Sequence, residues 1–336
     1  MINKTQDEII KDWKNTSSSD PLVSISCITY NHINYIEQCL DGFLEQETDY
    51  PFEILIHDDC STDGTTEIIQ KYSTKYPDII KPMYETENQY QKGKPAGSLI
   101  WNIPRAKGKY IALCEGDDYW IDENKLQMQV DFLEKNPEYG MCYTKTKQYL
   151  QNTQKFTKKT FGSEFAGFED LLKNGNRIPT LTSVFRKDLL DKYQQEIHPS
   201  DKGWLMGDYP MWLWFSHESK IKFFDKVTAV YRVLENSASH SVDVEKQIRF
   251  EKNAEEIKCF FSNFYSVDYD VCSNDEIYFY VYLQELTKQY DKHNASLLRY
   301  YFKKSYVKSV KNRIFYLCSF SSWSWSVLSF CRKTFP

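Results

Sequence analysis

Three carboxylates fall within four residues of the sequence, at Glu115, Asp117 and Asp118. They directly follow a short apolar run, residues 110–114, which is typical of a strand buried on both faces. Carboxylates this close together repel one another unless a cation lies between them. Oxygen ligands without a neighbouring Cys or His pair favour Mg²⁺ or Mn²⁺, usually shared with substrate phosphates.

The other interpretation of this cluster is an acidic turn that caps the helix expected from about Asn124. The buried strand before the cluster favours the metal, because ligands in open α/β sheets collect outside the carboxyl ends of the strands.

A single carboxylate, Asp208, precedes a strongly apolar stretch that runs from Met211 to Phe215. Pro210 lies between them, where the first turn of a helix tolerates proline. From its position alone, Asp208 is best interpreted as the N-cap of this helix.

Strand and helix patterns alternate from Pro21 onward. This alternation predicts an α/β fold, a three-layer αβα sandwich with a mostly parallel sheet. The second strand also ends in carboxylates, at Asp58 and Asp59. A helix is expected over residues 97–106, and the polar segment 145–165 is expected to form a variable loop or hairpin. Strands are expected over residues 22–28, 52–56, 79–84, 109–114, 139–144 and 179–186.

Several motifs of other protein classes are absent from the sequence. Neither Gly-x-Gly-x-x-Gly after the first strand nor Gly-x-x-x-x-Gly-Lys-Ser/Thr occurs, which disfavours dinucleotide enzymes and P-loop NTPases. Nine cysteines without a Cys-x-x-Cys pair indicate a reducing compartment rather than a disulfide framework or a zinc ribbon. The polar N-terminal stretch lacks the apolar core of a secretory signal, which predicts a cytoplasmic protein.

Five segments, taken in order, resemble glycosyltransferase family 2, whose members have the GT-A fold. They read VSISCITYNHINYIEQCL, EILIHDDCSTDGT, GKYIALCEGDDYW, GDYPMW and YRVLENSASHS. The resemblance implies a catalytic GT-A domain over residues 21–242, preceded by a lead-in of residues 1–20. It further implies a nucleotide-diphospho-sugar as donor and a divalent cation, Mn²⁺ or Mg²⁺.

The resemblance also assigns residues to the nucleotide base of the donor. Thr29, Tyr30 and Asn31, at the end of the first strand, would contact or stack on the base. Asp59, with Asp58 as its partner, would hydrogen-bond the polar edge of the base.

The acidic cluster resembles the metal motif of the family, usually Asp-x-Asp, with Glu115 at its first position. The resemblance assigns Asp117 to the ribose, the diphosphate and the metal, Asp118 to the metal, and Glu115 to a contact with the diphosphate or acceptor. Lys94 and His240 are candidates for contacts with the diphosphate, and for both the alternative is a solvated loop residue.

A Gly-Asp pair before an aromatic helix matches the place where inverting members carry their catalytic base, which assigns that role to Asp208. Such a base removes the proton of the acceptor hydroxyl as the new bond forms. Trp120, beside the acidic cluster, is expected either to stack on the acceptor or to pack in the core.

The sequence therefore predicts an inverting, metal-dependent glycosyltransferase. Its acceptor would be the hydroxyl of a saccharide or lipid-linked saccharide, in surface polysaccharide or glycolipid synthesis, and nucleic acid is not expected as a partner. One alternative is a sugar-phosphate nucleotidylyltransferase, but such enzymes usually carry a Gly-rich loop after the first strand, where this chain has TYNHINY. Another is a non-catalytic sugar- or nucleotide-binding module, which would need no separate base.

Residues 243–336 are expected to form a C-terminal helical region, with helices over 244–261, 275–290 and 295–311. Residues 292–336 contain nine Lys or Arg and no Asp or Glu, so this tail carries +9, residues 1–291 carry −14, and the chain carries −5. Six serines between Ser319 and Ser329 argue against a membrane span. Two interpretations stay open: an interfacial anchor on the anionic inner face of the cell membrane, or helices that pack on the catalytic domain or on a partner.

Overall fold

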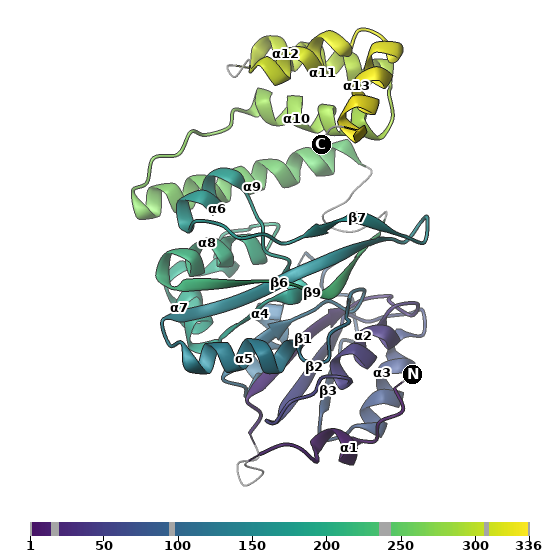
Figure 1. Cartoon of the computed structure of the whole chain (residues 1–336), viewed down its shortest axis with the longest axis vertical. Helices are drawn as coiled ribbons and strands as arrows, with labels where there is room; N and C mark the ends of the chain where they lie inside the picture. Colours follow the sequence, from purple (N-terminus) through teal and green to yellow (C-terminus); the bar gives the residue numbers. More distant parts are fainter. Residues whose placement is uncertain (1, 15–19, 94–97, 235–242, 306–308, 335–336) are drawn as a thin grey trace. The chain divides into compact units, whose positions relative to one another are not determined.

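The structure is a computed structural model that describes residues 2–14, 20–93, 98–234, 243–305 and 309–334 (Figure 1). The chain divides into two compact units, Met1–Leu234 and Glu235–Pro336. The first unit holds the sheet, and the second consists of helices in its described residues. The expected α/β class with a C-terminal helical region is confirmed.

The sheet of the first unit has nine strands in the order β3-β2-β1-β4-β8-β6-β9-β5, with β7 paired to β6. Neighbours among β3, β2, β1 and β4 are parallel, so the carboxyl ends of these four strands lie at one edge. They span Val23–Thr29 (β1), Phe52–Asp58 (β2), Ile80–Tyr84 (β3) and Tyr110–Leu113 (β4).

The other half of the sheet is mixed. The pairs β4/β8, β8/β6, β6/β7 and β5/β9 are antiparallel, and β6/β9 is parallel. The polar segment 145–165, expected to be a loop or hairpin, is mostly the hairpin of β6 and β7. These two strands are antiparallel, as the short turn between them requires. These strands span Tyr119–Trp120 (β5), Tyr139–Leu150 (β6), Lys155–Phe161 (β7), Val184–Arg186 (β8) and Lys220–Val233 (β9).

Helices pack on the sheet through apolar stripes. In α2, for example, Ile36, Cys39, Leu40 and Phe43 recur every three or four residues and all are buried. The helices of this unit span Gln6–Ile10 (α1), Ile36–Leu44 (α2), Thr65–Lys75 (α3), Ser98–Trp101 (α4), Lys125–Lys135 (α5), Phe168–Asn174 (α6), Lys187–Ile197 (α7) and Asp208–Glu218 (α8).

Three predicted elements differ from the structure. The helix expected over residues 295–311 ends at Lys304, because Ser305 has an extended backbone, and another helix begins at Val310. The helix expected over residues 97–106 is the short α4 followed by a 3₁₀ turn, Ile103–Arg105, because Pro104 cannot donate the hydrogen bond that would continue the helix. The strand expected over residues 179–186 begins with another 3₁₀ turn, Thr180–Thr182. There the hydroxyl of Thr182 donates to the carbonyl of Pro179, a local bond that competes with the strand ladder.

The second unit contains α9 to α13. Its core includes Phe279, Leu298, Phe302, Phe315 and Trp325, which lie on four different helices. No helix among the described residues is long and apolar enough to cross a membrane. The helices span Val244–Tyr265 (α9), Asn274–Lys288 (α10), Lys292–Lys304 (α11), Val310–Cys318 (α12) and Ser322–Thr334 (α13).

Candidate active site

The acidic cluster lies at the carboxyl end of β4, beside the carboxyl end of β1. The backbone N–H of Gly116 donates to the carbonyl of Ile28 across 3.0 Å, which holds the two strand ends together. A Cβ atom on Gly116 would lie 2.7 Å from Oγ1 of Thr29 and 3.1 Å from Nδ1 of His32. The close approach of the acidic turn to β1 therefore requires glycine at this position.

The three carboxylates of the cluster are close enough to share one cation. One oxygen from each of Glu115, Asp117 and Asp118 lies within 4.8 Å of the others. Oδ1 of Asp117 is buried and has no hydrogen-bond partner among the described residues. A buried carboxylate oxygen without a donor is costly, and a hard divalent cation is the ligand that such oxygens accept. The residues present therefore fit a Mn²⁺ or Mg²⁺ ion.

The charges in the cluster also favour a cation. Water reaches Glu115, yet protein atoms crowd its carboxyl group, and this burial together with Asp117 and Asp208 raises the pKa of Glu115 to about 8. The pKa of Asp118 is raised by burial and by the charges of Asp117 and Glu115, against the hydrogen bond from the Arg232 backbone. A divalent cation would offset this repulsion.

Arg232, near the end of β9, joins the cluster although the sequence analysis did not select it. Its backbone N–H donates to Oδ1 of Asp118 across 2.7 Å, and its guanidinium donates to the carbonyl oxygen of Asp117. The guanidinium also lies 5.1 Å from the ring centre of Tyr35 and 4.4 Å from that of Tyr119. Arg232 is almost fully buried and thus places a fixed positive charge beside the acidic turn.

His32 is a second site residue that the sequence analysis missed. Nδ1 of His32 lies 3.1 Å from Oγ1 of Thr29, and Nε2 lies 4.0 Å from Oδ2 of Asp117. Burial lowers the pKa of His32, and Asp117 and Asp63 partly oppose that effect. The available signal was its place three residues after Thr29, where the first strand ends.

The residues assigned to the nucleotide base gather at the same sheet edge. Thr29 pairs with Asp58 in the β1/β2 register, so the two assigned segments are adjacent. Thr29 is buried, Tyr30 is half-buried, and Asn31 is exposed with a left-handed backbone at φ 53°. Oδ1 of Asn31 accepts a hydrogen bond from the backbone N–H of Thr62 across 2.8 Å.

Asp58 and Asp59 both have partners within the protein. Oδ1 of Asp58 accepts from the backbone N–H and the hydroxyl of Ser61. The two oxygens of Asp59 accept from the backbone N–H groups of Gln89 and Tyr90, across 2.8 and 3.1 Å. Asp59 thus ties the segment after β3 to the end of β2, next to the residues that the resemblance assigns to the base.

Asp208 is the first residue of α8, and Gly207 occupies the N-cap position without a side-chain cap. The interpretation of Asp208 as the N-cap is therefore wrong, although Oδ1 of Asp208 does accept from the backbone N–H of Tyr209. Oδ2 accepts from the hydroxyl of Thr180 across 2.6 Å. The carboxylate is near enough to the acidic cluster that its charge raises the pKa of Glu115.

One of the predicted contacts, Trp120, does not join this site in the structure. Trp120 is buried in the core, where its ring meets Phe43 edge to face at 4.7 Å and its Nε1 donates to the carbonyl of Leu181. Trp120 therefore packs rather than faces an acceptor. Lys94 and His240 lie outside the described residues.

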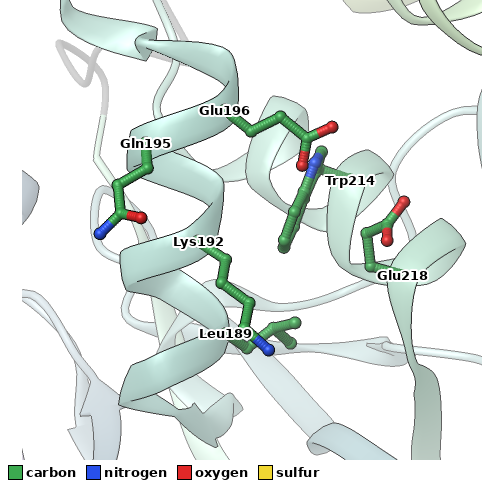
Figure 2. Close-up of a pocket in the computed structure, with 6 residues that line it drawn as sticks. All are labelled: Leu189, Lys192, Gln195, Glu196, Trp214 and Glu218. Carbon is green, nitrogen blue, oxygen red and sulfur yellow. The ribbon is translucent and has the colours of Figure 1, made fainter.

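A surface pocket of about 370 Å³ is formed by residues of α7 and α8 (Figure 2). None of its lining residues is one of the predicted site residues. We therefore place the candidate active site at the strand ends and not in this pocket. The pocket is lined by Leu189, Lys192, Gln195, Glu196, Trp214 and Glu218.

Comparisons with known proteins identify the family of the chain. Residues 24–194 match the model of the family described as glycosyl transferase family 2. An uncharacterized protein of Mycobacterium tuberculosis is 31% identical over 238 residues, which cover 67% of this chain and 62% of that protein. The UDP-Glc:alpha-D-GlcNAc-diphosphoundecaprenol beta-1,3-glucosyltransferase WfgD of Escherichia coli is 28% identical over 223 residues, covering 66% of this chain and 80% of that one.

Among solved structures, S. aureus TarS 1-349 in complex with UDP-GlcNAc superposes with a TM-score of 0.53 at 18% identity, covering 88% of this chain and 79% of that one. At this identity the likeness shows the fold alone. The family match covers the half of the chain that carries β1, β2, β4 and the acidic cluster. The chain belongs to glycosyltransferase family 2.

Proposed function

We propose that this chain is an inverting, metal-dependent glycosyltransferase that uses a nucleotide-diphospho-sugar. The observation that supports it most is the pairing of two kinds of carboxylate at one sheet edge. Asp117 and Asp118 form part of a cluster that fits a cation, whereas Asp208 lies on another element and is held by a hydroxyl. Donor binding needs the first kind, and proton removal from an acceptor needs the second.

In this proposal Asp117 and Asp118 hold the cation, which when bound neutralises charge on the leaving diphosphate. Thr29, Tyr30 and Asn31 orient the base, with Asp58 and Asp59 beside them. The guanidinium of Arg232 is anchored at the Asp117 carbonyl and keeps the acidic turn in place.

Asp208 would accept the proton of the acceptor hydroxyl while that oxygen bonds to the anomeric carbon and the nucleoside diphosphate departs from the opposite face. This one-step displacement inverts the configuration and needs no covalent intermediate. Oδ2 of Asp208 can receive the proton as the Thr180 hydroxyl turns away, or Oδ1 can receive it beside the Tyr209 N–H.

We propose a saccharide or a lipid-linked saccharide as the acceptor. The name of WfgD states a diphosphoundecaprenol-linked acceptor, and TuaG of Bacillus subtilis, 31% identical over 166 residues, is named a putative teichuronic acid biosynthesis glycosyltransferase. Neither the nucleotidylyltransferase nor the binding-module alternative gains support from the family match.

The test is to incubate the chain with UDP-glucose or UDP-N-acetylglucosamine and a lipid-linked saccharide, with Mn²⁺ or with a chelator. We expect UDP release that depends on Mn²⁺ and on the acceptor, and a product whose new linkage is β by NMR when the donor is α. A retained configuration would contradict the inverting mechanism. Full activity in the presence of the chelator would contradict the dependence on a metal.

A further inference from the structure

Two consecutive helices of the C-terminal unit expose large apolar side chains at helical spacing. Val310, Ile314 and Leu317 recur every four and three residues on α12, so they lie on one face of that helix. Phe320, Trp323 and Val327 follow with spacings of three and four, in the turn before α13 and on α13 itself. The side chains of Leu317 and Trp323 are 65% and 76% exposed. We call these six residues the exposed stripe.

The same two helices are fixed by other side chains. Phe315 and Trp325 are buried, and Nε1 of Trp325 donates to the carbonyl of Leu286 across 2.8 Å. Tyr316 stacks on Phe302 of α11 at a ring distance of 4.6 Å. These inward-facing side chains hold α12 and α13 on the unit, whereas the residues of the exposed stripe are open to solvent. Large apolar residues gathered on an exposed surface mark an interaction site.

Positive charge accompanies the stripe. Lys303, Lys304, Lys311 and Arg313 are exposed, and residues 292–336 contain no Asp or Glu. The guanidinium of Arg299 lies 4.7 Å from the ring centre of Phe320 and donates to the carbonyl of Ser319. Cations and apolar side chains thus share one region of the unit.

We propose that the exposed stripe and its flanking cations bind the surface of an anionic phospholipid membrane. Aromatic and aliphatic side chains beside Lys and Arg are the combination that lies in the interface of such a membrane, with the cations at the headgroups. A second copy of this chain is a poorer partner, because its tail would bring the same positive charge to the contact.

This inference does not depend on the transfer reaction. Membrane binding concerns the C-terminal unit only. A failure to bind membranes would not contradict the proposed sugar transfer, and a failure to transfer sugar would not contradict membrane binding.

The test is cosedimentation of the full chain with vesicles of phosphatidylcholine, with and without phosphatidylglycerol, at low and high salt. We expect binding to the anionic vesicles only, weaker at high salt because exposed charges are then screened. Leu317→Ser with Trp323→Ser should weaken binding about tenfold, since it removes apolar area from the stripe. The matched control is Phe264→Ser with Val271→Ser, two exposed apolar residues elsewhere in the unit.

A second pair of variants tests the charges. Lys311→Glu with Arg313→Glu should weaken binding at least about tenfold, because each cation near an anionic surface contributes about 1 kcal/mol. Lys246→Glu with Arg249→Glu changes the net charge equally on exposed residues of α9 and should have little effect. Melting temperatures of all four variants check that they are folded.

Several outcomes would overturn the proposal. They are no binding to anionic vesicles at low salt, equal binding to neutral vesicles, and equal losses in the stripe variants and their controls. A wild-type chain that binds no vesicles but is a dimer that the stripe variant dissociates would instead assign the stripe to self-association.

Discussion

The hydroxyl of Thr180 donates a hydrogen bond to Oδ2 of Asp208 across 2.6 Å, and it does so from the 3₁₀ turn that replaces the first part of the strand expected over residues 179–186. The bond joins a residue just before β8 to the first residue of α8, 28 positions later. If Asp208 is the base, Thr180 is the residue that positions it.

We expect Thr180→Val to lower kcat for transfer about tenfold while the donor KM stays near that of the wild type, because the variant loses a hydrogen bond to a charged group. Thr180→Ser keeps the hydroxyl and should restore most of the rate. Steady-state kinetics of both variants check this. If Val is as active as Thr, or if Ser is as slow as Val, Thr180 does not position the base.

For the metal we expect Asp118→Asn to abolish most of the melting-temperature increase that Mn²⁺ with UDP gives the wild type. Ligands stabilise a protein in proportion to the logarithm of their excess over Kd, so weaker binding shows directly in this increase. The amide oxygen can still accept from the Arg232 backbone, which preserves the local structure.

In chelator, Asp118→Asn should be at least as stable as the wild type, because it removes a buried charge that neighbouring carboxylates repel. Asp268→Asn, on an exposed residue of the C-terminal unit, is the control for the loss of one negative charge. An undiminished Mn²⁺ effect in Asp118→Asn would exclude Asp118 as a ligand.

Lys125 gives a prediction about pH. Its side chain is fully buried, its Nζ has no hydrogen-bond partner among the described residues and lies 4.1 Å from the ring centre of Trp120. Burial lowers the pKa of Lys125 from 10.5 to about 7, against the charge of Asp122. Between these values the unfolded chain binds more protons than the folded protein, so this residue makes stability rise with pH.

We therefore expect Lys125→Met to raise the free energy of unfolding at pH 6, where the wild type must bury a charged amine. The difference between variant and wild type should shrink as pH rises from 7 toward 10.5, by at most about 1.4 kcal/mol per pH unit. Urea unfolding at several pH values measures it. A pH-independent difference would show that folding does not lower the pKa of Lys125.

The parallel half of the sheet could be predicted well from the sequence. Its strands β1, β2 and β4 are short, largely apolar runs, and such local composition is enough to predict a buried strand. The position of the acidic cluster followed from the rule that ligands collect at strand ends. Arg232 could not be found in this way, because its partner Asp118 lies 114 residues earlier and only the β5/β9 pairing brings the two together.

The turn at Thr180 was missed for a different reason. PTLTSVFR has the β-branched and aromatic residues of a strand, but the side chain of Thr182 bonds the carbonyls of Pro179 and Thr144 and favours a turn. Trp120 was ambiguous because an aromatic residue beside a site serves equally as a core residue or a sugar platform, and only its contact with Phe43 decides.

Asp208 is the residue that we propose removes the proton of the acceptor hydroxyl. The most direct measurement is single-turnover transfer by Asp208→Asn at saturating donor and acceptor, with donor affinity and melting temperature measured on the same protein. In the Asn variant the amide oxygen can keep the hydrogen bond from the Tyr209 backbone, and the amide N–H can donate to the Thr180 hydroxyl, which reverses the direction of that bond. We predict a transfer rate at least about 10² lower than wild type, with unchanged donor affinity and melting temperature, because an amide cannot accept the proton. A variant that transfers sugar at nearly the wild-type rate would exclude Asp208 as the base.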